Sequence, residues 1–508
     1  MITKNASFAA LAAFVCATAF GAYVNPIVDA DMSDPDCDTA DGKSFWLVTS
    51  SFTDIPGLPL YRSTDLVHWE LANHALKSPP KGGLDVLLDG ADFGVRGHGV
   101  WAPAIRFHDG LWYIFWGDPD RGIYRTTAKD PEEEWSEPEL IKPGRGFIDP
   151  CPLWDDDGSF HLVHAYAASR AGFNSVLNLD GRIVYDGIPD GNHTIEGPKL
   201  YKRDGWYWIF APAGGVIHGW QLALRSRSLK GPFEPRIVLR KGDTRVNGPH
   251  QGAWVRKADG SEWFLHFQDK GYAGRVLHLQ PLAWSEDGWP VMGDGGNPVS
   301  ASDAAGDGSS APLAVDWVAD QSDRRIFETP SGRRLYSGAT YFTKIPAPSF
   351  TATANATVWA KDGERGILGL VLVGDRNVLI GLKPDTENDR FDVVLKDGDE
   401  TKRLGRIPAE RFSAGARTVW KAKASIVARV EPSKDNPRVG EAVLSLGEFT
   451  SKPFRIENSV WQGLKIGMTV EADFSKSGLG LSSMGSMRDP KNRHSNWLDL
   501  ESFEFAVR

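Results

Sequence analysis

The sequence has few cysteines, no excess of basic residues and, beyond its first twenty residues, no long apolar run. It carries three cysteines and a formal net charge of −9 in 508 residues. A protein that binds nucleic acid needs a basic face, and none stands out, so we expect no nucleic-acid partner. No later stretch of about 18 apolar residues could span a bilayer, so we expect no membrane partner. The length exceeds one ordinary domain and indicates two or three.

The first 22 residues have the layout of a secretory signal peptide. Lys4 precedes an apolar run from Phe8 to Phe20, and the small residues Ala17, Thr18 and Ala19 stand near the end of this run. A charged start, a short apolar stretch and small residues are typical of an exported protein. We therefore expect a periplasmic or secreted protein, with cleavage between Ala19 and Ala22.

Cleavage would remove Cys16 and leave Cys37 and Cys151. These two residues could pair in an oxidising compartment, but buried free thiols are the favoured expectation.

Glycine and tryptophan are the abundant residues. The 54 glycines suit a turn-rich all-β protein, and the 19 tryptophans are far more than usual. Large aromatics often simply fill a β core. Their flat faces also stack on sugar rings, so this count mildly favours a carbohydrate ligand.

Asp-Gly followed by an aromatic-rich, strand-like run occurs five times. The spacing between successive glycines is 68, 48, 47 and 55 residues. Asp-Gly between two β-rich runs indicates a hairpin, and a period near 50 suits one four-stranded blade per repeat. A β-sandwich is the alternative, but five blades closing in a ring are the favoured fold. The five glycines are Gly42, Gly110, Gly158, Gly205 and Gly260.

Eight to ten residues before each of these glycines lies a second recurring position. Equivalent positions in a ring of blades converge on one axis, so these side chains should meet at one end of a central channel. Crowded carboxylates in a partly dry pocket push their pKa values apart, which provides a proton donor and an acceptor. The five residues are Asp34, Trp101, Asp149, Glu196 and His250.

Several motifs resemble glycoside hydrolase family 43. They are NPIVDADMSDPD, TSSFTDIPGLPLYRSTDLVHWE, VWAPAIRFHDG, IDPCPLWDDDG, IEGPKLYKRDG, GPHQGAWV and FQDKGYAGRVLHLQP. The resemblance covers about Asn25 to Gly293. It implies a five-bladed β-propeller and an inverting enzyme of the β-xylosidase or α-L-arabinofuranosidase type.

The same resemblance implies roles for the three acids. Asp34 matches the general base, Glu196 the general acid, and Asp149 the acid that orients Glu196 and raises its pKa. An inverting hydrolase needs such a base and acid on opposite faces of the anomeric carbon. Of the neighbouring aspartates, we interpret Asp31 as solvated or capping and Asp36 as a support behind the base.

The resemblance also indicates binding residues. Phe52 and Trp101 would form apolar walls for the sugar, and Arg275 would reach the sugar hydroxyls or the acids. His250 matches a central histidine that in some members binds a calcium ion or an ordered water. No cofactor is needed for the chemistry. The segment Thr53–Ile55 stands where xylosidases of the family usually have a more aromatic sequence. This difference leaves the choice between xylose and arabinose open.

A second β domain follows a linker. Residues 294–312 are rich in Gly, Asp, Ser, Ala and Pro, which is typical of a linker. Alternating runs such as GILGLVLVG and EAVLSLG predict a β-sandwich over 313–508, concanavalin-like by resemblance. The expected catalytic domain is thus 23–293. The second domain is expected to pack and to lend at most a loop to the pocket rim.

The sequence therefore predicts an exo-acting, inverting glycoside hydrolase that releases single pentoses from xylan- or arabinoxylan-type oligosaccharides. β-Xylosidase activity is favoured and α-L-arabinofuranosidase activity is the alternative. A retaining fructan hydrolase is more distant, because its WMNDPNG-type opening is missing. A non-catalytic glycan-binding propeller is opposed by the intact acid trio.

Overall fold

The computed structural model describes most of the chain from residue 23 onward. The expected signal peptide and most of the expected linker lie outside the described residues. The described ranges are 23–80, 97–166, 175–178, 183–186, 195–299, 316–320, 325–363, 365–414, 417–459, 461–471 and 496–507.

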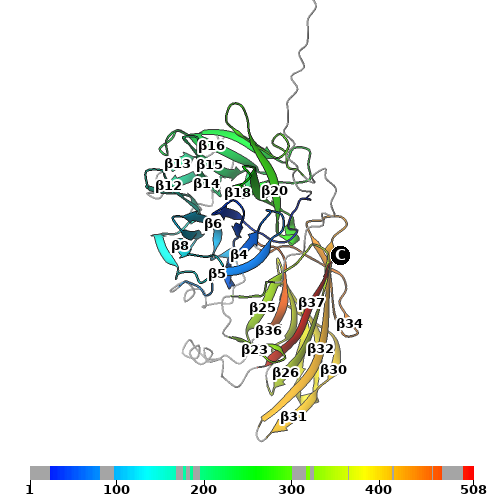
Figure 1. Ribbon diagram of the computed structural model, residues 1–508. Coiled ribbons are helices and arrows are strands. Elements are labelled where there is room, and N and C mark those ends of the chain that lie inside the picture. The colour runs from blue at the N-terminus through cyan, green and yellow to red at the C-terminus, as the bar shows by residue number, and fades with distance from the viewer. Residues whose placement is uncertain are drawn as a thin grey trace, which may run out of the picture.

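The N-terminal part contains five antiparallel four-stranded sheets among its described residues (Figure 1). In each sheet the strands follow one another in chain order. The first sheet skips only β3 (Asp54–Ile55). The strands are β1 (Asp36–Thr39), β2 (Phe45–Val48), β4 (Gly57–Ser63), β5 (Glu70–Leu76); β6 (Trp101–His108), β7 (Leu111–Asp118), β8 (Gly122–Ala128), β9 (Glu139–Pro143); β10 (Phe147–Trp154), β11 (Phe160–Tyr166), β12 (Ser175–Asn178), β13 (Ile183–Asp186); β14 (Lys199–Arg203), β15 (Trp206–Ala213), β16 (Trp220–Ser226), β17 (Glu234–Arg240); β18 (His250–Arg256), β19 (Glu262–Asp269), β20 (Arg275–Trp284) and β21 (Pro290–Met292).

The five Asp-Gly repeats are the hairpin turns that join the first two strands of each sheet. All five glycines have positive φ, between 68° and 85°. Glycine adopts this conformation without steric cost, which explains why the repeat carries it. The expectation of five hairpins from the sequence is confirmed.

Neighbouring sheets pack through shared apolar clusters. Phe45 of the first sheet, for example, lies in one cluster with Leu265 of the fifth. Further clusters join the first sheet to the second, the second to the third, the third to the fourth and the fourth to the fifth. The N-terminal stretch also pairs with the fifth sheet, because Ile27 N–H donates to the Leu277 carbonyl. The arrangement is all-β and propeller-like.

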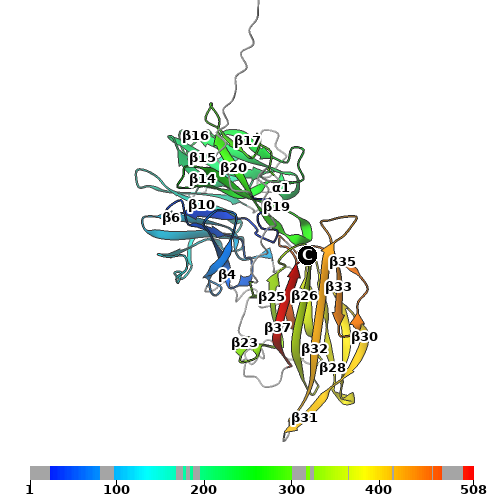
Figure 2. The same cartoon turned by 45° about the vertical axis from the view of Figure 1, so that its right-hand side comes forward.

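The C-terminal part consists of two large antiparallel sheets, turned to show their strands in Figure 2. The strand runs predicted from the sequence are confirmed as strands. The eight-stranded sheet has the order β3, β22 (Val318–Asp320), β25 (Ala339–Lys344), β36 (Lys465–Val470), β27 (Leu368–Val373), β28 (Asn377–Asp385), β29 (Arg390–Asp397) and β30 (Glu400–Pro408). The nine-stranded sheet contains β23 (Ile326–Thr329), β24 (Gly332–Tyr336), β37 (Trp497–Val507), β26 (Phe350–Lys361), β32 (Arg417–Pro432), β33 (Gly440–Leu446) and β34 (Phe449–Thr450), with β31 (Glu410–Ala414) beside β32 and β35 (Phe454–Ile456) beside β33.

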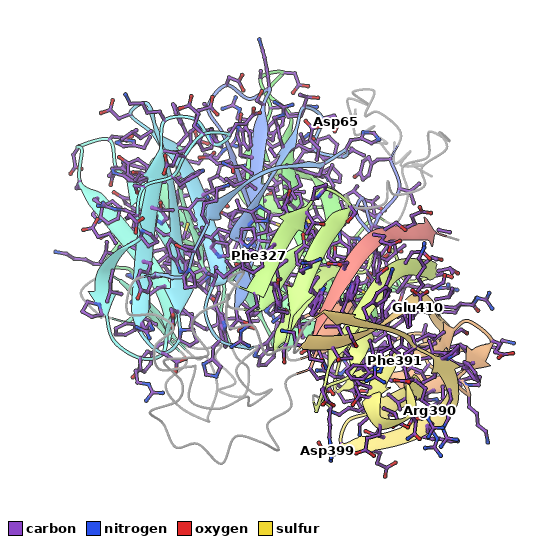
Figure 3. The ribbon with its side chains drawn as sticks, turned by 90° about the horizontal axis from the view of Figure 1, so that it is seen from below. Asp65, Phe327, Arg390, Phe391, Asp399 and Glu410 are labelled. Carbon is purple, nitrogen blue, oxygen red and sulfur yellow. The ribbon has the colours of Figure 1, made fainter. Side chains whose placement is uncertain are left out.

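Side chains from both large sheets form one apolar core, in which Ile380 and Leu370 of one sheet meet Ile426 and Ala352 of the other. Figure 3 shows this part from below, with Arg390, Asp399 and Glu410 labelled on it. The few helices among the described residues are single turns: α1 (Gly215–His218), η3 (Gly271–Ala273) and η5 (Thr386–Asn388). None of them is long and apolar enough to cross a membrane.

One strand crosses between the two parts. β3 follows β2 in the chain, yet it pairs with β22 in the eight-stranded sheet, with Ile55 opposite Ala319. A buried ion pair lies beside this strand, where the Lys465 ammonium group contacts both Asp54 carboxylate oxygens at 2.5 and 2.6 Å. The unusual residues at 53–55 therefore form a contact between the N-terminal and C-terminal parts.

Candidate active site

Each of the five four-stranded sheets has a residue with left-handed backbone at the start of its first strand. A non-glycine residue with positive φ is uncommon and tends to occur where a side chain must be aimed. In three sheets the strand pairing also shifts register here, as in a β-bulge, which turns side chains out of the regular alternation. The five residues and their φ angles are Asp34 (55°), Ala102 (36°), Asp149 (54°), Gly197 (55°) and Gln251 (37°).

This left-handed position corrects the repeat alignment made from the sequence. Asp34 and Asp149 occupy it, whereas Trp101, Glu196 and His250 each come one residue before it. Counting back from the Asp-Gly turns made the five residues look equivalent. The number of residues between the left-handed position and the turn differs by one between sheets, and this difference hid the shift in position. The structure nevertheless brings the acids together, as their contacts show.

Asp34 is a buried carboxylate with two side-chain donors. Arg275 Nη1 donates to its Oδ1 at 2.8 Å, and Ser50 Oγ donates to its Oδ2 at 2.6 Å. Ser50 Oγ in turn accepts from the Ala102 backbone N–H at 2.7 Å, so Asp34 is tied to the second sheet. These contacts fix the carboxylate and balance its charge. Arg275 thus contacts Asp34, one of the two alternatives that the family resemblance implied for it.

Asp149 lies against the segment that carries Glu196. Its Oδ2 accepts the Gly197 backbone N–H at 2.8 Å. Burial raises the pKa of Asp149 well above its usual range, and the negative charges of Glu196 and Asp34 raise it further. The Gly197 N–H and the Lys199 charge oppose this rise. Burial and the acidic neighbours therefore favour a proton on Asp149.

Glu196 forms a hydrogen bond with His250, at 2.6 Å between Oε1 and Nε2. Burial alone would raise the pKa of Glu196, but the hydrogen bond and charge of His250, with the charge of Arg275, bring it below its usual value. The repulsion between the two carboxylates raises the pKa of Asp149, while His250 offsets it at Glu196. The Glu196 side chain is 15% exposed against 6% for Asp34, so Glu196 is the acid that faces solvent more openly.

Three aromatic rings stand beside the acids. Phe52 and Trp101 meet edge to face, with 6.5 Å between ring centroids, and Trp461 lies 6.3 Å from Trp101. The Arg275 guanidinium lies 5.8 Å from the Trp461 ring centroid. Trp461 is 44% exposed and comes from the C-terminal part. The sequence analysis missed this residue, because nothing in its surroundings marks it as close to residues 360 positions earlier.

Asp31 holds the segment that carries Trp461. It is buried, and its Oδ1 accepts from the Ser33 hydroxyl and from the Arg275 N–H. Its Oδ2 accepts the Gly463 backbone N–H at 3.2 Å. Of the two interpretations of Asp31, solvated or capping, the first is therefore wrong, because the buried carboxylate accepts backbone N–H groups. Asp31 instead connects three segments at one point: the segment before Asp34, the strand that begins at Arg275, and the C-terminal part.

The surroundings of His250 do not suit a calcium ion. Ca²⁺ takes six to eight oxygen ligands, but His250 offers only ring nitrogens, and its Nε2 already faces Glu196. Among the residues that the structure describes, no group of three His, Cys, Asp or Glu could hold a metal ion. We therefore derive no step through a metal.

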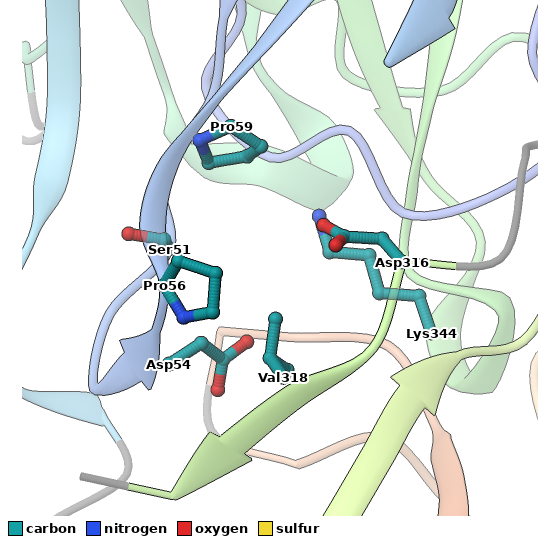
Figure 4. Close-up of a pocket in the computed structure, with 7 residues that line it drawn as sticks. All are labelled: Ser51, Asp54, Pro56, Pro59, Asp316, Val318 and Lys344. Carbon is teal, nitrogen blue, oxygen red and sulfur yellow. The ribbon is translucent and has the colours of Figure 1, made fainter. Parts of the chain in front are cut away.

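A small pocket lies where the two parts meet (Figure 4). The sticks show Asp54 and Pro56 on one side, opposite Val318 and the side chain of Lys344. Asp54 already binds Lys465, and Lys344 Nζ donates to the Asp31 carbonyl. The pocket belongs to the seam between the parts and is not a candidate catalytic centre.

Cys37 and Cys151 are buried and unpaired, which confirms the expectation of free thiols.

Curated relatives of this chain carry glycosidase names. A "Putative beta-xylosidase" of Xylanibacter ruminicola is 40% identical over 278 residues, which cover 54% of this chain and 50% of the relative. A "Non-reducing end alpha-L-arabinofuranosidase" of Bacteroides ovatus is 28% identical over 472 residues, which cover 84% of this chain and 82% of the relative. The chain thus spans about half the length of the first relative and most of the second.

Solved structures share the fold over almost the whole chain. "Bacteroides ovatus Xyloglucan PUL GH43B" aligns with a TM-score of 0.71 at 21% identity, covering 96% of this chain and all of the other. A xylan beta-1,4-xylosidase from Bacillus halodurans aligns with a TM-score of 0.71 at 19% identity, covering 95% and 99%. The profile of "Glycosyl hydrolases family 43" matches residues 23–290, more than half of the sequence. The left-handed positions, the converging acids and this match lead to one conclusion: the chain belongs to glycosyl hydrolase family 43.

Proposed function

We propose that this family 43 enzyme is an exo-acting, inverting β-xylosidase that releases single pentoses from xylan- or arabinoxylan-type oligosaccharides. One observation carries the proposal: Asp34, Asp149 and Glu196, from three different sheets, converge through Arg275, Gly197 and His250. The 40% identity to a relative named as a putative β-xylosidase supports the choice of sugar.

In this proposal Asp34 is the general base. Arg275 and Ser50 hold its carboxylate, so that the lone pairs they leave free can take a proton from the attacking water. Glu196 is the general acid, which suits its greater exposure. The departing sugar oxygen would receive the Glu196 proton on the opposite face of the anomeric carbon.

Asp149 and Glu196 would act as a pair that shares one proton. Asp149 attracts the proton in the structure described above, whereas catalysis needs it on Glu196. A glycosidic oxygen placed against Glu196 stabilises the protonated carboxyl by accepting its hydrogen bond. Substrate binding would thereby move the proton from Asp149 to Glu196, and the charge left on Asp149 would keep it there.

The proposed architecture is a five-bladed β-propeller at 23–293, a linker at 294–312 and a concanavalin-like β-sandwich at 313–508. The packing of each four-stranded sheet against the next, and of the fifth against the first, supports a closed ring. The single core between the two large sheets supports a sandwich. The signal-like residues 1–22 support export to the periplasm or beyond the cell.

α-L-Arabinofuranosidase activity is the second candidate, and a specific observation favours it. A relative whose alignment covers 84% of this chain, and so extends into the C-terminal part, is named as an arabinofuranosidase. Trp461 faces Trp101 beside the acids, so the C-terminal part helps to shape the pocket.

Product analysis tests both candidates. The enzyme would be incubated with xylobiose, xylotriose and arabinose-substituted xylo-oligosaccharides, and the released sugars separated by chromatography. Xylose released one unit at a time supports the first candidate, and arabinose with an intact xylose backbone supports the second. Proton NMR of the first product would show the inverted anomer. Release of oligosaccharides, or a retained anomer, would overturn the proposal.

A further inference from the structure

A buried polar network lies directly behind the acids and touches all five four-stranded sheets. Two residues beyond each left-handed position come Asp36, Ala104, Cys151, Lys199 and Ala253. Two residues farther come Asp38, Arg106, Leu153, Tyr201 and Val255. Alternate residues of a strand share a face, so these two sets form layers behind the catalytic layer. The alanines leave room for the long polar side chains between them.

Arg106 is at the centre of this network. Its Nη1 donates to Asp36 Oδ2 at 2.6 Å, and its Nη2 donates to Cys151 Sγ at 3.1 Å. Cys151 Sγ also accepts the Leu200 N–H at 3.2 Å. Tyr201 lies under the Arg106 guanidinium, and its hydroxyl accepts the Trp254 N–H of the fifth sheet.

Lys199 is the network residue closest in sequence to Glu196. Its side chain is 1% exposed, its Nζ donates to the Pro103 carbonyl at 3.1 Å, and Asp36 Oδ1 lies 3.7 Å away. That oxygen has no hydrogen-bond partner. A wholly buried ammonium group is costly, and one carboxylate serves both Lys199 and Arg106. The buried ammonium group of Lys199 therefore lies behind the three acids, with the nearest carboxylate oxygen of the network 3.7 Å away.

We propose that Lys199 is a positioning residue for proton transfer: its buried charge favours Asp149 as the ionised partner and Glu196 as the protonated partner during hydrolysis. Lys199 lies two residues beyond Gly197, whose N–H donates to Asp149, and the charge of Lys199 lowers the pKa of Asp149. This inference rests on the proposed roles of the two acids.

Other charges surround the pair and must stay constant in a test. Glu196, Asp34 and the Gly197 N–H face Asp149, while His250 and Arg275 face Glu196. Asp38 lies deeper beside Arg106, and burial raises its pKa to about 6. Only substitutions within the network change the Lys199 contribution and leave these groups in place.

The test compares Lys199→Met with Lys199→Arg. A pKa difference of one unit changes proton distribution tenfold, so Lys199→Met should lower kcat on xylobiose about tenfold. The loss on a nitrophenyl pentoside should be much smaller, because that leaving group needs little protonation. The alkaline limb of the pH profile should move up by about half a unit to one unit, because the pair keeps its last proton longer. Lys199→Arg should restore both properties.

Two further variants test the direction of the shift in the pH profile and provide a control. Asp36→Asn removes the carboxylate that balances Lys199 and Arg106, so the alkaline limb should move to lower pH. Cys151→Ala breaks the same network without changing charge, so it should lower thermal stability and leave the pH profile unmoved. If Lys199→Met does not fold, the opposite shift in Asp36→Asn decides the question.

An infrared titration of the carboxyl groups, with Asp149→Asn as the reference, separates this inference from the proposed function. It reports the protonation of Asp149 without any substrate. A higher pKa in Lys199→Met supports the inference even if the preferred sugar is another one. An unchanged titration, or equal loss on both substrates in folded Lys199→Met, overturns it.

Discussion

Glu196 Oε1 and His250 Nε2 lie 2.6 Å apart, and this contact joins the fourth and fifth sheets at the site. With Glu196 ionised, the imidazole N–H donates to it. The other ring nitrogen, Nδ1, is buried without a hydrogen-bond partner. His250 therefore stabilises the form of Glu196 that cannot yet donate a proton, and a substrate must compete with this hydrogen bond before the acid can act.

Removing the acid and removing the base should have different consequences. Glu196→Ala should lose about 10²- to 10⁴-fold in kcat/KM on oligosaccharides, the usual size of a proton-transfer contribution, and much less on nitrophenyl glycosides. Asp34→Ala should lose heavily on both, because the water must be activated whichever group departs. Steady-state kinetics on the two substrate types measure this. Equal losses for Glu196→Ala would mean that its role is wrong.

Trp461 should contribute to substrate binding although it belongs to the C-terminal part. Trp461→Ala removes a ring that faces Trp101 and Arg275, and kcat/KM should fall about tenfold, mainly through KM. Phe412→Ala is the matched control, because Phe412 has the same exposure, 45%, and lies on β31. A similar effect of both substitutions would argue against a role for Trp461 at the site.

The ion pair between Asp54 and Lys465 should matter for stability. Both side chains are buried, so Lys465→Met removes the ammonium group that contacts both oxygens of a buried carboxylate and should cost about 3–5 kcal/mol in unfolding free energy. The double variant Asp54→Leu/Lys465→Met should recover much of this loss. Urea unfolding measures both. Arg455→Gln, which breaks an exposed pair with Asp435, should have a barely measurable effect. No recovery in the double variant would contradict the expectation.

The protein should lose stability as the pH falls from about 6.5 towards 4. Burial lowers the pKa of His266 from 6.5 to about 4, and burial also lowers the pKa of His278. In this window the unfolded chain binds a proton that folded His266 does not, so His266 costs up to about 1.4 kcal/mol per pH unit. Above pH 6.5 this penalty is absent.

His266→Gln should flatten the dependence. The variant loses stability at pH 7, because Gln280 Nε2 and the Phe267 carbonyl lose their His266 partner. Its deficit relative to the native protein should shrink as the pH approaches 4. Thermal melts at pH 7, 6 and 5 provide the comparison, and parallel curves would refute the assignment.

The sequence predicted the acids but not their protonation. Asp34, Asp149 and Glu196 were found because each begins a repeat and stands in a family motif. The lowered pKa of Glu196 depends on its contact with His250, 54 residues away, and no spacing rule reports such a contact.

The contacts between the two parts could not be predicted from the sequence, for a different reason. Trp461 and Gly463 approach Trp101 and Asp31 only because the C-terminal sheets dock in one orientation. Asp31 looked like an ordinary loop aspartate, since its third partner comes from 432 residues away. Alternating strand patterns specify faces within a sheet and leave the docking of two domains undetermined.

The pairing of β3 with β22 limits how this enzyme can evolve. Asp54 and Ile55, which follow Phe52 closely in the chain, form the edge of a sheet that otherwise belongs to the C-terminal part. Exchange of that part for another module would therefore break backbone pairing next to the pocket and expose a strand edge prone to association. Recombination between relatives should preserve both parts together, so that sugar preference is inherited from the pair and not from the N-terminal part alone.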